Sequence, residues 1–144
     1  MNAEKRLTLI SKIKAMETHE GCEILLSIED FFEGYTSDQC NICANNRKNI
    51  STTEFRQRLD DIRTKETVSG VFVRFYEYTD ALEYGDSWIG SDSIYIITSD
   101  SADEVRSWFE DFEVTDTWEE RDPTKFMNCP SIPEGHRLVA AWWD

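Results

Sequence analysis

Basic side chains are scarce in this sequence: 15 Lys and Arg stand against 29 Asp and Glu, a formal net charge of −14. Such a chain is repelled by nucleic-acid backbones and by anionic lipid surfaces, so we expect neither direct nucleic-acid binding nor membrane binding. No apolar run approaches the ~20 residues needed to cross a bilayer. Lys5, Arg6 and Lys12 interrupt the N-terminal segment, which therefore lacks the apolar region of a secretory signal. These absences predict a cytoplasmic protein.

Sequence motifs of the common enzyme classes are also missing. The six glycines are scattered, and none lies in a Gly-rich phosphate loop. The sequence contains no G-x-S-x-G nucleophile elbow and no H-E-x-x-H zinc motif. Carboxylates are abundant enough that pairs of them arise by chance, so they do not diagnose a hydrolytic site. We therefore predict a protein that is not an enzyme and uses no cofactor, with a small carboxylate- or zinc-dependent hydrolase as the alternative.

Cysteine offers only one suggestive spacing. Cys40 and Cys43 are separated by two residues, as in many zinc sites and redox motifs, whereas Cys22 and Cys129 are isolated. A structural zinc ion is usually bound by two close pairs of ligands. In a reducing compartment the default state is a thiol. The favoured interpretation is four structural thiols with no metal, and zinc binding and redox chemistry remain the alternatives for Cys40 and Cys43.

The remaining composition is that of a folded protein. Hydrophobic residues make up 40% of the 144 residues and aromatic residues 12%, which argues against disorder despite the charge. A chain of this length fits one domain, so we predict a single globular domain over residues 1–144. No linker, repeat or low-complexity segment is visible.

The negative charge is concentrated in one third of the chain. Residues 1–76 carry 12 acidic and 11 basic side chains, and residues 123–144 carry two of each. Residues 77–122 carry 15 acidic side chains and only two basic ones, a net charge of −13. Solubility alone does not require such concentration, and a local negative charge accelerates association with a basic partner. A solvated acidic face with no partner is the alternative explanation.

Hydrophobic periodicity predicts an α+β protein. Apolar residues recur at helical spacing after Ala3, after Ser51 and after Ser101, and the two serines are each followed three residues later by Glu, as in a capping box. The predicted strands cover residues 22–28, 71–78, 93–98 and 137–143, with a further short strand at 113–118. Residues 34–49 are predicted to form a long loop. This order favours an antiparallel or mixed sheet of four to five strands covered by about three helices.

Aromatic residues accompany the acidic third of the chain. Tyr84 and Trp88 lie in or beside a predicted acidic loop, a composition typical of interface hot spots, although ordinary packing is the alternative. Trp142 and Trp143 are adjacent in a predicted strand, so one of them is expected to face outward.

Two stretches resemble a group of small, acidic bacterial proteins of uncharacterised activity. They are S-I-E-D-F-F-E-G at residues 27–34 and W-I-G-S-D-S-I-Y-I-I-T-S at residues 88–99. The resemblance covers roughly residues 22–120 and its motifs are structural, so it implies no catalytic residues. In size and charge the chain is also similar to bacterial immunity proteins, which neutralise toxin domains.

These observations lead to one functional hypothesis and two alternatives. We expect an immunity-type inhibitor that neutralises a basic toxin or nuclease domain through the acidic surface of residues 77–122. The alternatives are the small hydrolase and a DNA mimic that occupies a nuclease or regulator. The predicted partner-binding residues are four carboxylates and two aromatic anchors: Glu83, Asp86, Asp92, Asp103, Tyr84 and Trp88.

Overall fold

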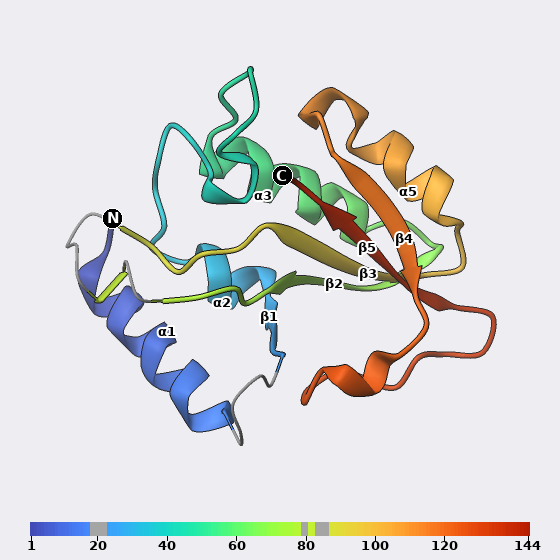
Figure 1. Cartoon of the computed structure of the whole chain (residues 1–144), viewed down its shortest axis with the longest axis horizontal. Coiled ribbons are helices and arrows are strands. Elements are labelled where there is room, and N and C mark those ends of the chain that lie inside the picture. The colour runs from blue at the N-terminus through green and yellow to red at the C-terminus, as the bar shows by residue number, and fades with distance from the viewer. Residues whose placement is uncertain (18–22, 79–80, 83–86) are drawn as a thin grey trace.

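The computed structural model describes residues 1–17, 23–78, 81–82 and 87–144. Figure 1 shows a twisted sheet with helices packed on it. The α-helices are α1 (Ala3–Met16), α2 (Ile28–Phe32), α3 (Thr52–Arg63) and α5 (Ala102–Trp108). The strands are β1 (Leu25–Ser27), β2 (Val68–Arg74), β3 (Ser93–Thr98), β4 (Asp116–Glu120) and β5 (Arg137–Trp142). Short 3₁₀ turns form η1 (Asn41–Cys43), η2 (Glu110–Phe112) and η3 (Pro123–Lys125).

The sheet has five strands in the order β1-β2-β3-β5-β4, and every neighbouring pair is antiparallel. The predicted α+β class is therefore confirmed, and the short strand predicted at residues 113–118 is present as β4, shifted to Asp116–Glu120. β3 lies in the middle of the sheet, and all six of its residues are buried. Burial on both faces explains why its apolar residues form a continuous run and do not alternate with polar ones.

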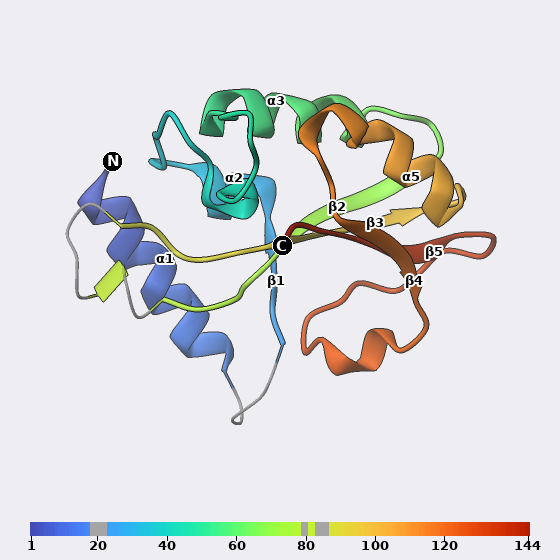
Figure 2. The ribbon, with the colours of Figure 1, turned by 45° about the horizontal axis from the view of Figure 1, so that its top comes forward.

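One face of the sheet is covered by α2, α3 and α5 (Figure 2). Alternate strand residues, such as Val73 and Ile96, join the main hydrophobic core together with the apolar stripes of these helices. The opposite face carries a smaller core under residues 123–133, where Phe126 meets Tyr95 edge to face with ring centroids 4.7 Å apart. The remaining α-helix, α1, packs its Leu9, Ile10 and Ile13 into the main core beside the sheet.

Serine caps begin three of the helices. The hydroxyl oxygens of Ser51 and Ser101 accept hydrogen bonds from the backbone N–H of Glu54 and Glu104, as their spacing predicts. Ser27 caps α2 in the same way by accepting from Asp30 N. The strand predicted over residues 22–28 is therefore too long, because the chain turns into α2 at Ile28.

The loop predicted at residues 34–49 is irregular but well attached. It contains η1, and its base is closed by hydrogen bonds from Cys40 N to Ile50 O (2.7 Å) and from Thr52 N to Ser37 O (3.0 Å). The strand predicted to reach Tyr78 ends at Arg74, and beyond it an isolated bridge joins Glu77 to Gly90. In the part of the chain that the structure describes, no helix is both long and apolar enough to span a membrane.

Candidate binding surface

The structure separates the six residues predicted to contact a partner. Glu83, Tyr84 and Asp86 lie outside the described residues. Asp92 precedes β3, whereas Asp103 is exposed in the first turn of α5, beyond the other end of that strand. A six-residue strand spans roughly 20 Å. Asp92 and Asp103 therefore do not belong to one compact site.

The predicted partner-facing role of Trp88 is corrected by its burial. The side chain is only 4% exposed, its indole N–H donates to the carbonyl oxygen of Phe31 (2.8 Å), and its ring stacks on Tyr35 with centroids 5.2 Å apart. The ring face against Tyr35 and the polar edge of the indole are thus engaged within the fold. This is the ordinary packing that was the alternative for Trp88, although the residue also forms part of the lining of the larger cavity described below.

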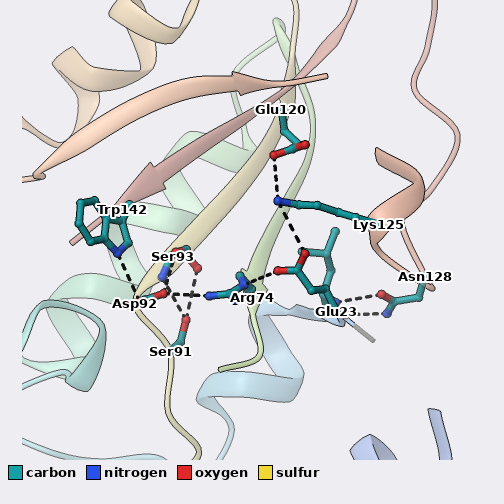
Figure 3. Close-up of polar contacts among 10 residues, drawn as sticks. Glu23, Arg74, Ser91, Asp92, Ser93, Glu120, Lys125, Asn128 and Trp142 are labelled. Atoms are coloured by element: carbon teal, nitrogen blue, oxygen red, sulfur yellow. Dashed lines mark hydrogen bonds and ion pairs between the residues drawn. The ribbon is translucent and has the colours of Figure 1, made fainter. Parts of the chain in front are cut away.

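Asp92 lies in a connected polar network at one end of the sheet (Figure 3). One carboxylate oxygen accepts from Ser93 Oγ at 2.8 Å and pairs with Arg74 at 3.3 Å, while the other accepts from the indole N–H of Trp142 at 3.3 Å. Arg74 also pairs with Glu23 (2.9 Å). These donors fix the orientation of the Asp92 carboxylate, which is still about one-third exposed.

Two adjoining hollows open beside Asp92. The larger one, of about 330 Å³, reaches toward Tyr35 and Glu77, and the smaller one, of about 180 Å³, reaches toward Trp142 and Asp144. Their linings share three residues: Asn41, Tyr76 and Asp92. We call these two cavities the paired hollows. Among the residues that the structure describes, no Lys or Arg lines either one.

Aromatic side chains border the paired hollows. Tyr76 is 59% exposed, an unusual degree for a large aromatic residue beside a buried core. Trp142 is half-buried, whereas Trp143 is 3% exposed and donates its indole N–H to Phe112 O. The expectation that one of the two adjacent tryptophans faces outward is confirmed, and it is Trp142.

Folding neutralises much of the acidic third. Among the described residues of the 77–122 segment, ion pairs with basic residues are formed by Asp92, Asp111, Glu113, Asp116, Glu119 and Glu120. Four of the basic partners, Arg47, Arg58, Arg74 and Lys125, come from outside that segment. The net charge of −13 therefore does not form one continuous acidic surface. Within the described residues, acidic side chains without an ion pair remain mainly on and beside α5, among them Asp103 and Glu110.

Sequence reasoning missed three residues that define the paired hollows. Tyr76 lies two residues beyond Arg74, the last residue of β2, and continues the alternation of side chains between the two faces of that strand. This alternation was the available sequence signal that the Tyr76 ring faces outward. Trp142 was recognised only as one of two candidates. Asn41 had no signal in the sequence, because its position depends on a turn of the 34–50 loop. Its side-chain N–H donates to Ile89 O at 2.8 Å, linking that loop to the start of the acidic segment.

The two cysteines of the C-x-x-C motif are buried side by side. Burial raises the pKa of the Cys40 thiol, while a hydrogen bond from that thiol lowers the pKa of Cys43. Within the described ranges, no group of three or more His, Cys, Asp or Glu side chains is arranged to hold a metal ion.

Ser69 in β2 and His136, which directly precedes β5, are in contact. Ser69 Oγ lies 3.0 Å from Nδ1 of His136. A nucleophilic serine needs a base that is itself oriented by a third group. In the described part of the chain no carboxylate bonds to His136, so this contact does not form a triad.

Taken together, these features define a small, acidic α+β protein with an aromatic, carboxylate-lined surface at one end of an antiparallel sheet. Residues 4–141 match the family described as "Uncharacterized protein YfbO family", and the chain belongs to this family. It is 32% identical over 121 residues to "Uncharacterized protein YfbO" of Escherichia coli (strain K12), with 83% of this chain and 82% of that protein covered. No solved structure matches the chain. The resemblance to a bacterial family of uncharacterised activity is thus confirmed at the family level, and the likeness to immunity proteins stays a prediction.

Proposed function

We propose that the protein is an immunity-type inhibitor, which neutralises a basic toxin or nuclease domain by binding it through the surface of residues 77–122. The observation that carries this proposal is the pair of hollows at Asp92, where exposed aromatic and carboxylate side chains meet without a lining Lys or Arg. In this proposal the paired hollows are the centre of the contact, and the acidic side chains on α5 provide long-range attraction.

The chemistry of the paired hollows suits a basic side chain. The Asp92 carboxylate is held by Ser93, Arg74 and Trp142, so it need not reorganise when a cation arrives. The guanidinium of Arg74 lies over the Tyr76 ring, 5.8 Å from its centroid. The rest of this exposed ring is available for a further cation–π contact with a partner's Lys or Arg, worth about 0.5–1 kcal/mol at an exposed site. Aromatic anchors surrounded by polar groups are typical of hot spots in protein interfaces.

Capture of partners by the immobilised protein, in lysate of cells that express it naturally, tests this function. The expected result is a basic protein that binds at low salt and whose toxic or nuclease activity the purified inhibitor abolishes. Affinity should fall by roughly tenfold or more between about 50 and 500 mM salt, because ions screen the exposed charges. A partner with no excess of basic residues, or binding indifferent to salt, would contradict the proposal.

Variants locate the contact surface. Tyr76→Ala is expected to weaken binding by roughly tenfold, the loss typical of an aromatic hot spot, with little effect on folding because the ring is mostly exposed. Asp103→Asn should weaken binding less and mainly through a slower association rate. Glu17→Gln is the matched control, since it removes one exposed negative charge at the end of α1 that is remote from Met1, which lines the larger hollow. Equal losses for Asp103→Asn and Glu17→Gln would mean that only net charge matters.

A further inference from the structure

The C-x-x-C motif is shaped by a tight turn. Cys40 precedes η1 with extended backbone angles, and Cys43 closes the turn by donating its backbone N–H to Cys40 O at 3.3 Å. The sulfur of Cys43 lies 3.8 Å from that same carbonyl oxygen. Both side chains point into the core and are at most 1% exposed. The turn therefore directs two thiols to the same buried point.

The two sulfurs are inequivalent. The Cys40 thiol donates a hydrogen bond to Cys43, which lowers the pKa of Cys43, whereas burial dominates at Cys40 and raises its pKa. The thiolate is the reactive form of cysteine. Cys43 is accordingly suited to attack an oxidant, and Cys40 is placed to attack the oxidised Cys43 afterwards.

We propose that Cys40 and Cys43 form a dithiol–disulfide redox site that reacts with small hydroperoxides. In the first step the Cys43 thiolate attacks one oxygen of hydrogen peroxide, the O–O bond breaks, hydroxide leaves and Cys43 becomes a sulfenic acid. In the second step the sulfur of Cys40 displaces water from the sulfenic acid and the S–S bond forms. The two thiols lose two electrons, and one peroxide is reduced to two waters.

Access to the pair needs only a local opening. Gln39 and Ala44, which flank the turn, are exposed, so the thiols lie one layer beneath the surface. The base of the loop is held by the hydrogen bond from Cys40 N to Ile50 O. Irregular segments open with a smaller free energy than the global fold. A peroxide is small enough to enter during such openings, so the reaction is slower than at an exposed thiol.

The redox site is linked to the paired hollows through Asn41, one of the two residues between the cysteines. Asn41 lines both hollows, donates its side-chain N–H to Ile89 O, and donates its backbone N–H to the hydroxyl oxygen of Tyr35 at 3.0 Å. A disulfide changes the backbone of the turn that holds Asn41. Oxidation is therefore expected to weaken partner binding, and this regulatory half of the inference rests on the proposed function.

Thiol counting by mass spectrometry tests the redox site without any partner. The double variant Cys22→Ser/Cys129→Ser retains only Cys40 and Cys43. Its reduced form is treated with hydrogen peroxide at pH 7, then unfolded and alkylated, and its mass is measured. We expect the two thiols to lose their reactivity toward the alkylating reagent together. The oxidised protein should weigh about 2 Da less than the reduced, unalkylated protein, because two hydrogens are lost. Dithiothreitol should restore both thiols fully. Peptide mapping of the unsubstituted protein gives the same answer if the double variant does not fold.

Single-cysteine controls separate the two steps. In the same background Cys40→Ser should leave a Cys43 sulfenic acid that dimedone traps, and Cys43→Ser should react several-fold more slowly than Cys40→Ser. Thiols that remain alkylatable, or that oxidise independently without forming an S–S bond, would overturn the redox site. Equal partner affinity of the oxidised and reduced forms would overturn the regulatory half alone. If no basic partner binds either form, the proposed function fails while the mass measurement still decides the redox site.

Discussion

The aromatic cluster around Phe55 shows how much of the core depends on one side chain. Phe55 is fully buried on α3, and its ring lies 5.3 Å from Trp143 and 5.4 Å from Phe112, measured between centroids. Phe55→Ala is expected to lower the free energy of unfolding by about 3–5 kcal/mol, through lost burial and the cavity left behind. Urea unfolding followed by tryptophan fluorescence measures this loss. Phe55→Leu, which keeps most of the apolar volume, is the control, and an equal loss for the two variants would contradict the packing argument.

Single residues were predictable where periodicity decides their environment. The stripe of Phe55, Leu59 and Ile62 is buried as its helical spacing predicts. Helical spacing after Ser101 predicts that Trp108 lies on the buried stripe of the last helix, but Trp108 is only half-buried, because α5 ends at this residue. Beyond it the chain continues through η2 to Glu113, whose φ of 55° is a left-handed conformation. A hydrophobic pattern of period 3.6 does not predict the residue at which the helix ends.

At the scale of the elements, the N-cap of α3 makes a measurable contribution to the stability of the fold. Ser51 Oγ accepts from Glu54 N at 3.1 Å, and this satisfies one of the free N–H groups of the first turn. Ser51→Ala is expected to cost about 1 kcal/mol of stability. Thr53→Ala, at an exposed position of the same turn, should change stability by less than about 0.5 kcal/mol. Equal urea midpoints for the two variants would argue against a capping role.

The edge strand β1 is fastened by a side chain from a distant loop. Asn128 accepts a hydrogen bond from Leu25 N at 2.9 Å and donates one to Leu25 O at 2.6 Å, so its amide imitates a neighbouring strand. Asn128→Asp keeps the shape and the acceptor but loses the donor. We expect a loss of about 1–2 kcal/mol at pH 7, because a carboxylate then faces the Leu25 carbonyl. Hydrogen exchange should report faster exchange at Leu26 and Ser27, and unchanged exchange in β1 would refute this role.

Elements with strong local signals were predictable, whereas α2 was not. Ile28–Phe32 continues the apolar run of β1, so the two elements could not be separated by hydrophobicity. The available signal was Ser27 followed three residues later by Asp30, which is the cap that the structure contains. The 34–50 loop was predicted, but its turn at Asn41 was not, because tertiary hydrogen bonds to Ile89 and Ile50 determine it. For the same reason the paired hollows could not be derived from sequence alone.

On the scale of the whole molecule, the sequence reveals the amount of charge but not its pairing. Arg58 comes from α3 yet makes a bidentate contact with Asp111, at 2.8 and 2.7 Å. Arg47 meets Glu113 across a similar separation in sequence. These contacts attach the nearly neutral first half of the chain to the acidic third. The acidic third is thus partly a structural counterpart of the basic residues and only in part a surface for a partner.

This pairing sets the expected response of stability to acid. Backbone N–H groups of Lys48 and Arg47 lower the pKa of Glu113, and the hydrogen bond from Arg58 lowers the pKa of Asp111. Each carboxyl therefore binds protons more weakly in the folded chain than in the unfolded chain. The stability they contribute is fully present above the unfolded pKa values, near 4, and is lost as the pH falls through the lower folded values.

We therefore expect the urea midpoint to be nearly constant from pH 7 to about 5 and to fall below that. The double variant Asp111→Asn/Glu113→Gln should start lower at pH 7 and lose less on acidification, because two of the responsible carboxylates are gone. Glu66→Gln should follow the original protein, since its carboxyl makes no such contact among the described residues. The opposing effect is self-repulsion from the net charge of −14, which weakens as carboxylates are protonated. A midpoint that rises steadily from pH 6 to 3 would show that self-repulsion outweighs the ion pairs between the two halves of the chain.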